Sequence, residues 1–301
     1  MLNFLPGPVL GVISFALYVL NTLFWCTSLF FVAVMKLVIP SEKWRDMCTS
    51  ILNRIANCWI SFNNVNLEVT KKIRWDTSGI DNLEPGEWYL VLSNHQSWVD
   101  ILVLQKIFHR RIPFLKFFLK KELIWVPIMG LAWWALEFPF MKRYSKQYLM
   151  RHPQHKGKDL EITKKACERF KKMPISVMNF VEGTRFTYQK HEKQKSPYTH
   201  LLRPKAGGVA FVLWAMGEQL HHILNVTIVY PGGVQNFWEF ICAGTNEIIV
   251  RVEALPITSD LIGDYSNDTR FREHFQKWIN TLWIEKDLFI EELSREKKKA
   301  A

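Results

Sequence analysis

The sequence is poor in the residues that build disulfide frameworks and metal–thiolate sites. Its 301 residues contain only five cysteines, an odd number, and no two of them stand at the Cys-x-x-Cys spacing. Scattered thiols of this kind argue against a disulfide-bonded secreted protein and against a zinc site. They favour reduced cysteines in a protein that faces the cytosol.

Charged side chains are missing from the N-terminal part of the chain. No Asp, Glu, Lys or Arg precedes Lys36, and residues 9–34 are almost continuously apolar. A helix of about 25 residues is about 38 Å long, more than the roughly 30 Å hydrocarbon core of a bilayer. A cleaved secretory signal is the competing interpretation, but no basic residue precedes this long apolar run and no small-x-small cleavage site follows it. We therefore predict a retained membrane helix, which crosses the bilayer or lies tilted in it.

Basic residues follow this segment directly, at Lys36, Lys43, Arg45 and Arg54. Because positive charge stays on the cytoplasmic side of a membrane, the rest of the chain is predicted to lie in the cytoplasm. Residues 44–62 carry one apolar stripe at helical spacing. This pattern fits equally well a helix packed on the domain and a helix lying in the headgroup layer.

The remainder of the chain alternates short runs of β-forming residues with helical patterns, which predicts an α/β fold with a mixed central sheet flanked by helices. The clearest strands are residues 88–93, 175–181 and 225–230. The predicted helices are residues 100–108, 159–172 and 207–218, with an amphipathic helix near the C-terminus containing Phe271, Phe275, Trp278, Ile279 and Leu282. Residues 143–158 and 187–205 are predicted to be polar connectors, and the apolar run 124–140 a core or interfacial helix, because about 17 residues are too few to span a bilayer.

A histidine and an aspartate follow the first predicted strand at once, in Ser93-Asn-His-Gln-Ser-Trp-Val-Asp100. Loops at the carboxyl ends of strands in α/β sheets commonly hold ligand chemistry. A neutral His95 could remove a proton from a hydroxyl, while the Asp100 carboxylate fixes the imidazole tautomer and stabilises the imidazolium. Five residues correspond to about 140° on an ideal helix, so the two can meet only if His95 precedes the helix that contains Asp100. Taken alone, a histidine five residues before an aspartate is more often structural than catalytic.

A second motif follows another predicted strand, in Phe180-Val-Glu-Gly-Thr-Arg-Phe186. Gly183 permits a tight turn with exposed backbone N–H groups, and Arg185 offers a planar charged fork suited to phosphate. Glu182 would orient the arginine or the turn. A β-turn with a surface ion pair is the alternative interpretation.

In this order and spacing, the two motifs resemble the glycerophospholipid acyltransferase family, whose members carry Asn-His, four residues and Asp, followed by Phe-Pro-Glu-Gly-Thr-Arg. Here Val181 replaces the proline, which affects the stiffness of the turn and not its charged groups. Residues 137–143 are similar to the family's middle motif, in which Arg143 would help to hold the acceptor phosphate. Residues 225–231 look like its last motif, a buried strand that ends in proline and shapes the acyl site. Lys120 and Lys121 fall where the family often places a lysine, before the Pro-x-x-Gly segment 127–130.

This resemblance implies a membrane-bound acyltransferase, closest to bacterial inner-membrane proteins of the family, with its catalytic domain on the cytoplasmic side. Residues 1–62 would form a membrane anchor with interfacial helices, and residues 63–301 the acyltransferase domain. His95 and Asp100 would be catalytic, and the acceptor would be bound by Glu182, Gly183, Thr184, Arg185, Arg143 and Lys121. The substrates would be a lysophospholipid, by default 1-acyl-glycerol-3-phosphate, and an acyl thioester of coenzyme A or acyl carrier protein, without a bound cofactor. No Gly-x-Ser-x-Gly setting is present, so direct transfer without an acyl-enzyme is expected.

Three other interpretations compete with this one. A metal enzyme is suggested by His152, His155, His191, His200, His221 and His222, although no carboxylate or cysteine completes a ligand set at the usual spacing. The net charge of +11 would suit nucleic acid as well as phospholipid, but there is no recognisable nucleic-acid motif and the apolar N-terminus favours a phospholipid surface. A family member that has lost activity and only binds lipid is the third interpretation.

Overall fold

The structure is a computed structural model. It describes residues 2, 4–141, 151, 167–168, 173–242 and 244–300, with only the backbone of residues 141 and 297–300.

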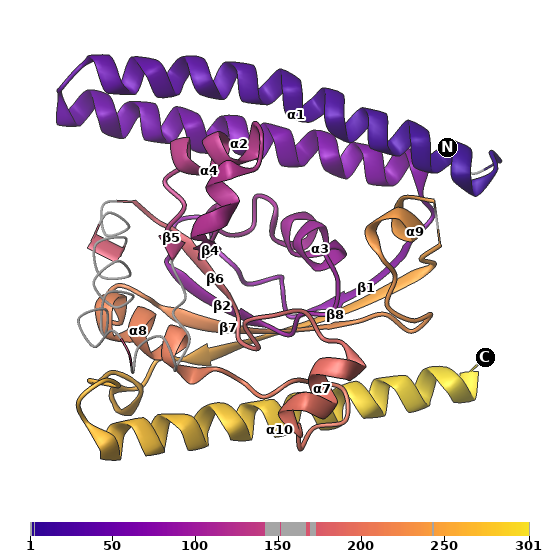
Figure 1. The fold of residues 1–301 in the computed structure, drawn as a ribbon, viewed down its shortest axis with the longest axis vertical. Coiled ribbons are helices and arrows are strands. Elements are labelled where there is room, and N and C mark those ends of the chain that lie inside the picture. The colour runs from indigo at the N-terminus through magenta and orange to yellow at the C-terminus, as the bar shows by residue number, and fades with distance from the viewer. Residues whose placement is uncertain are drawn as a thin grey trace.

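The chain begins with two long antiparallel helices that lie side by side across one side of the molecule (Figure 1). Helix α1 spans Gly7–Val38 and begins beside Pro8, since proline is tolerated in the first turn of a helix. Helix α2 spans Glu42–Thr70, beyond the predicted end at residue 62, so the expected boundary between anchor and domain falls inside it. Among the described residues, α1 is the one helix long and apolar enough to cross a membrane.

Polar contacts join the two helices along much of their length. Asn21 Nδ2 donates to the Trp59 carbonyl at 3.0 Å and to Asn63 Oδ1 at 2.8 Å, and Asn66 Nδ2 donates to the Ser14 carbonyl at 3.0 Å. We call residues 7–70 the helical hairpin. Because of these contacts, α1 is a fixed part of the fold.

A mixed six-stranded sheet fills the centre of the molecule, in the order β1-β8-β7-β2-β6-β3. Its strands are β1 (Arg74–Ser78), β2 (Tyr89–Ser93), β3 (Leu115–Phe117), β6 (Ser176–Phe180), β7 (His222–Val229) and β8 (Glu247–Pro256). All neighbours pair in parallel except β7 and β8. The α/β class and the three strands predicted from sequence are confirmed, and β1, β3 and β8 were not predicted.

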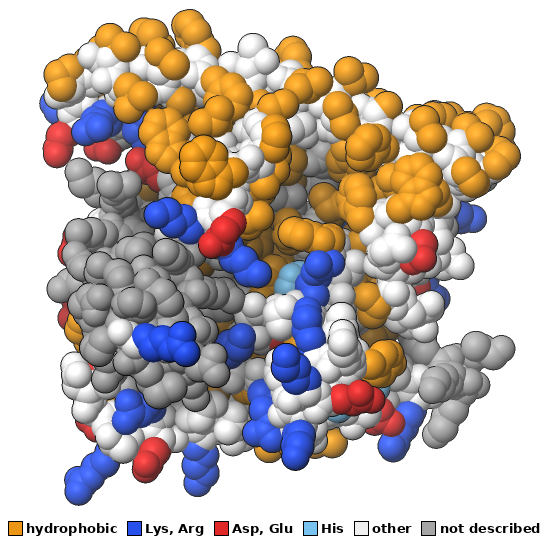
Figure 2. Space-filling view, viewed as in Figure 1, with side chains coloured by type: hydrophobic (Ala, Val, Ile, Leu, Met, Phe, Trp, Pro, Cys, Tyr) orange, Lys and Arg blue, Asp and Glu red, His pale blue; other side chains and the backbone are white. Residues whose placement is uncertain are grey.

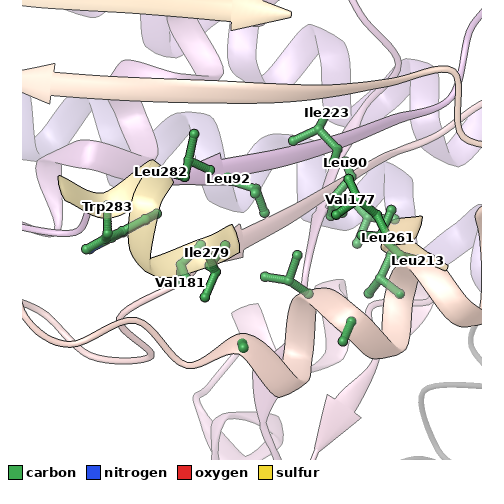
Figure 3. Close-up of a cluster of buried hydrophobic side chains, with 14 of the residues drawn as sticks. Leu90, Leu92, Val177, Val181, Leu213, Ile223, Leu261, Ile279, Leu282 and Trp283 are labelled. Atoms are coloured by element: carbon green, nitrogen blue, oxygen red, sulfur yellow. The ribbon is translucent and has the colours of Figure 1, made fainter. Parts of the chain in front are cut away.

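Helices cover both faces of this sheet (Figure 1). Helix α3 (Val99–Phe108) lies between the sheet and the helical hairpin, and its apolar residues pack with Leu67 of α2. Helices α8 (Ala206–Met216) and α10 (Thr269–Ala300) cover the opposite face. Figure 3 shows the core on that face, where Val181 and Leu92 pack with Ile279 and Trp283 of α10.

Two expectations about the connecting segments were wrong. The apolar run 124–140 is a broken segment, in which the 3-10 helix η1 (Lys121–Trp125) and helix α4 (Met129–Ala135) lie between β4 (Leu119–Lys120) and β5 (Phe140–Met141). The run breaks at Ile128, whose φ of 65° is not helical, directly after a proline. The connector 187–205 contains a helix, α7 (Tyr188–Gln194). Thr187 is its N-cap, and the Thr187 side chain accepts a hydrogen bond from the Lys190 N–H.

The remaining short elements are α9 (Phe237–Ile241) and the 3-10 helix η3 (Ser259–Leu261). Most of the predicted helix 159–172 and the connector 143–158 lie outside the described residues.

Candidate active site

The sheet itself brings the two sequence motifs together. Strands β2 and β6 are parallel neighbours, and Ser93 at the end of β2 pairs with Phe180 at the end of β6. The next residues of both strands therefore emerge at the same edge of the sheet, which places His95 and Glu182 side by side. This is the carboxyl edge, where α/β proteins commonly place their ligand sites.

His95 and Asp100 form a close pair. His95 Nδ1 lies 2.8 Å from Asp100 Oδ2, with His95 in the turn after β2 and Asp100 in the first turn of α3, as predicted. The same carboxylate oxygen accepts the backbone N–H groups of Gln96 at 2.6 Å and Ser97 at 2.9 Å. The turn is thus closed around the carboxylate that holds the imidazole.

Two further side chains support this pair and were not assigned a role from the sequence. The Tyr230 hydroxyl donates to Asp100 Oδ1 at 2.6 Å, and it is buried, which together with the neighbouring carboxylate raises its pKa well above the usual value. Asn94 donates to the Ile228 carbonyl and accepts the Ile228 N–H, both at 2.9 Å. These bonds fasten the turn after β2 to strand β7. Both residues could have been singled out from the sequence, because Asn94 adjoins His95 and Tyr230 ends a predicted strand.

The second motif holds the backbone and ring of His95. Glu182 Oε1 accepts the His95 N–H at 3.0 Å, and the Phe186 N–H donates to the His95 carbonyl at 2.7 Å. The ring of Phe180 stacks on the imidazole, with ring centroids 3.8 Å apart. His95 is therefore fixed by its backbone, by its Nδ1 and by one face of its ring.

Glu182 is fully buried, which differs from its expected place among the acceptor-binding residues. Its second oxygen accepts the Leu202 N–H at 3.0 Å, so both oxygens are occupied by backbone groups. Burial raises the pKa of this carboxyl to about 8, against the opposing effect of the Leu202 and His95 N–H groups. A carboxylate so enclosed can position His95 but presents no free surface to an acceptor.

The remaining residues of the motif turn outward. Gly183 has a φ of 69°, in the left-handed region that favours glycine. Thr184 Oγ1 accepts a hydrogen bond from Lys190 Nζ at 2.9 Å. Arg185 is exposed, and its guanidinium carbon lies 4.8 Å from the centre of the Trp98 ring. This cation–π contact places a permanent positive charge over the turn between His95 and Asp100.

One predicted site residue is not brought into this arrangement, and another lies outside the described residues. Lys121 lies exposed at the start of η1, and among the described residues it has no hydrogen bond or ion pair with His95, Asp100 or Arg185. Arg143 lies outside the described residues, as do His152 and His155 of the metal interpretation. In the part of the chain that is described, no three His, Cys, Asp or Glu side chains are grouped so that they could hold a metal ion.

The geometry suits general-base chemistry at a hydroxyl. If Asp100 is ionised, it accepts the Nδ1 proton of His95 and leaves Nε2 as the ring nitrogen that can take up another proton. A cation stands nearby at Arg185, on the surface side of the same turn. The site can therefore combine proton removal with the binding of an anionic group.

Comparisons with known proteins place the chain in a family. The Acyltransferase family model matches residues 74–231, just over half of the chain and a range that contains both motifs. Human 1-acyl-sn-glycerol-3-phosphate acyltransferase alpha is 24% identical over 171 residues, which cover 56% of this chain and 53% of the human protein. Human 1-acyl-sn-glycerol-3-phosphate acyltransferase delta is 24% identical over 219 residues, which cover 68% of this chain and 53% of that protein.

This chain thus spans about half the length of the curated relatives it matches. Among solved structures, the 1-acyl-sn-glycerophosphate (LPA) acyltransferase PlsC from Thermotoga maritima has a TM-score of 0.49 and 16% identity, over 90% of this chain and 95% of that one. The match to the family model decides the assignment: the chain belongs to the acyltransferase family.

Proposed function

We propose that the protein is a membrane-bound O-acyltransferase that moves a fatty acyl group from a thioester to the hydroxyl of a lysophospholipid. The observation that carries this proposal is the His95–Asp100 pair at 2.8 Å beside the exposed Arg185. The relatives are named for the acceptor 1-acyl-sn-glycerol-3-phosphate. We take this lysophospholipid as the acceptor, and acyl-CoA or acyl carrier protein as the donor.

In the proposed reaction, His95 Nε2 removes the proton of the acceptor hydroxyl as its oxygen attacks the thioester carbonyl. The tetrahedral intermediate then collapses, the carbon–sulfur bond breaks, and the imidazolium returns its proton to the leaving thiolate. Asp100 stabilises the imidazolium between these two steps. General-base catalysis of this kind contributes about 10² to 10⁴ in rate, and alignment of donor and acceptor contributes further.

The acceptor phosphate is proposed to bind at Arg185, because a guanidinium matches the paired oxygens of a phosphate. Arg143 and Lys121 are proposed to add positive charge as the acceptor docks. The Gly183 N–H donates to the Phe180 carbonyl at 2.8 Å, so Gly183 is proposed to shape the turn that presents Arg185. Glu182 is assigned a positioning role for the His95 backbone, since its carboxylate is buried.

The helical hairpin is proposed to hold this site at a phospholipid surface. The outward face of α1 carries large apolar side chains such as Leu20, Phe24 and Phe31, the last of them 70% exposed. Figure 2 shows hydrophobic side chains over the hairpin and lysines and arginines below them on the same face. Because α1 is bonded along α2, the geometry favours a hairpin that lies in the membrane surface. We further propose the cytoplasmic side of a bacterial inner membrane as its location.

The test is acyl transfer by membranes that contain the protein. Labelled acyl-CoA or acyl carrier protein is supplied with a panel of lysophospholipids, and the diacyl product is followed by mass spectrometry. We expect product with 1-acyl-glycerol-3-phosphate and a fall of at least about 100-fold in His95→Ala. His274→Ala is the matched control, because His274 pairs with Asp260 at 2.9 Å on an exposed surface. No product from any acceptor with either donor would favour a catalytically inactive, lipid-binding protein.

A further inference from the structure

A short segment beside the helical hairpin presents large apolar side chains to solvent. It runs from η1 through the turn at residues 126–128 into α4, and Trp125 at the end of η1 is 85% exposed. Further exposed apolar side chains follow on the turn and along α4, namely Val126, Ile128, Leu131 and Trp134. We call residues 121–135 the apolar segment. Contiguous exposed apolar surface marks a place where a protein contacts a partner or a membrane.

The apolar segment is held in one shape, so this exposure is built into the fold. A Cβ at Gly130 would collide with the Ile124 carbonyl oxygen, so glycine lets α4 approach η1 this closely. The Gly130 N–H donates to the Val126 carbonyl at 2.8 Å. Ile128 keeps a φ of 65°, which is unfavourable for a β-branched residue. The chain is thus folded back sharply, and Trp125 stays outside the core.

The apolar segment is continuous with the helical hairpin. Its inner side chains, Ala132 and Ala135, belong to one buried cluster with Leu29 and Ala33 of α1. Figure 1 places α4 against the hairpin, and Figure 2 shows hydrophobic side chains over both on the same face, with charged side chains below them. Within the described ranges, α1 alone is long and apolar enough to cross a membrane. A lipid layer that covers α1 on this face would therefore reach the apolar segment as well.

The chemistry of the apolar segment matches a phospholipid surface. Tryptophan is enriched at the boundary between headgroups and acyl chains, and both Trp125 and Trp134 are exposed here. Lys120 and Lys121 are exposed where the segment begins, so their ammonium groups would meet anionic headgroups. A protein partner would not require the patch to continue onto a helix that is able to cross a membrane.

The base of the apolar segment lies close to His95. Phe138, three residues after α4, stacks with Phe117 of β3, with ring centroids 6.3 Å apart. The Phe117 ring lies 6.1 Å from that of Phe180, which in turn stacks on the His95 imidazole at 3.8 Å. The place of this segment on a membrane would therefore set how far the imidazole lies from the lipid.

We propose that the apolar segment is a second membrane contact, in which Trp125 enters the headgroup layer beside α1 and turns the carboxyl edge of the sheet toward the lipid. A hairpin alone leaves the domain free to rotate about the long axis of the hairpin on the membrane. A second contact at its side removes that freedom, and the acceptor can reach His95 directly from the lipid layer. This inference deepens the proposed function, and it rests on that function only for its activity readout.

Photo-crosslinking tests the contact independently of activity. Benzoylphenylalanine is placed at position 125 of the full chain, the protein is reconstituted in vesicles of phosphatidylethanolamine and phosphatidylglycerol, and adducts are identified by mass spectrometry after irradiation. We expect phospholipid adducts at position 125. Position 214 is the matched control, where no lipid adduct is expected, because Trp214 is 39% exposed on α8, on the opposite face of the sheet. Adducts to protein alone at position 125, or no adduct there, would overturn the proposal.

Trp125→Glu tests whether the contact orients the site. The hairpin should keep this variant on sedimenting vesicles, and thermal unfolding should not change, because the exposed Trp125 side chain contacts little of the protein. Burial of one large apolar side chain is worth about a factor of ten or more in an equilibrium constant, so the KM for a vesicle-borne lysophospholipid should rise about tenfold. The KM for a short-chain acceptor that dissolves as monomers should stay unchanged. Trp125→Phe should keep most of the wild-type behaviour, and Trp214→Glu should keep all of it.

The two readouts separate this inference from the proposed function. Lipid adducts at position 125 without acyl transfer by the wild type would contradict the proposed function and leave the membrane contact standing. A loss in Trp125→Glu that is equal for vesicle-borne and monomeric acceptors would show damage to the site, and the orienting role of Trp125 would then be wrong.

Discussion

Replacement of Asp100 by asparagine isolates the contribution of the carboxylate charge. Asp100 Oδ2 accepts three N–H groups, from the His95 ring, Gln96 and Ser97, while Oδ1 accepts the Tyr230 hydroxyl. The two backbone N–H groups cannot turn away, so the amide oxygen of the introduced asparagine should take the Oδ2 position. The amide nitrogen then faces Tyr230, whose hydroxyl can accept as well as donate.

This orientation preserves the tautomer of His95 and removes only the negative charge. The imidazolium that forms in the reaction loses a unit charge at about 4 Å, which is worth roughly 4 kcal/mol at an effective dielectric constant of 20. Since each 1.36 kcal/mol is a factor of ten in rate, the expected fall in kcat is on the order of 10³. The KM for the acceptor should change little, because Asp100 is buried and lies on the far side of the imidazole from Nε2.

The assay is acyl transfer at saturating donor and acceptor, with product counted by mass spectrometry and folding checked by thermal unfolding. Double replacement of Asp100 by asparagine and Tyr230 by phenylalanine is the companion variant, in which the amide loses its partner on the Oδ1 side and a further loss is expected. A fall in kcat of less than about tenfold in Asp100→Asn would show that the charge does not stabilise an imidazolium. The general-base mechanism would then be wrong.

Three other outcomes follow from single contacts of the site and the helical hairpin. Tyr230→Phe should lower the free energy of unfolding by about 1.5 to 3 kcal/mol, because it removes the hydrogen bond to Asp100 Oδ1, and chemical denaturation measures this. Arg185→Lys should raise the KM for a lysophosphatidate about tenfold, because an ammonium cannot make the two parallel hydrogen bonds of a guanidinium to phosphate. The KM for an uncharged monoacylglycerol should stay unchanged. Equal effects on both acceptors would contradict phosphate binding at Arg185. Replacement of the exposed Phe24 and Phe31 by glutamate should stop the protein from sedimenting with phospholipid vesicles, and its thermal unfolding should not change. Unchanged sedimentation would exclude α1 as the part of the protein that contacts the membrane.

The sequence predicted the parts of the fold whose pattern is local. Strand β2 is a short run of apolar β-forming residues, and α1 is a long uncharged run, so periodicity and composition were sufficient. Strand β8 was missed although residues 248–250 are apolar and Arg251 and Glu253 then alternate with apolar residues, a pattern that itself indicates a half-buried strand. The broken segment after β4 was missed because its break depends on a single backbone conformation at Ile128.

In the site, too, local patterns were predictable from the sequence and contacts between distant segments were not. His95 and Asp100 were found because they are five residues apart and their meeting depends only on a strand-to-helix turn. The burial of Glu182 could not be read from its motif, because it depends on Leu202, which approaches from a loop 20 residues further along the chain.

Two buried carboxylates adjoin His95, and the number and kind of their donors separate their roles. Asp100 accepts three N–H groups and a hydroxyl, one of them from the ring that changes charge during the reaction, so its charge is available to the imidazolium. Glu182 accepts only two backbone N–H groups, and it faces the reaction through the peptide of His95. Burial raises the pKa of this carboxyl to about 8, and its two N–H donors only partly oppose that effect. The loop that carries Leu202 is itself held by Asp287 of α10, which accepts the N–H groups of Thr199 and His200, so a helix on the other face of the sheet helps to place the partner of Glu182.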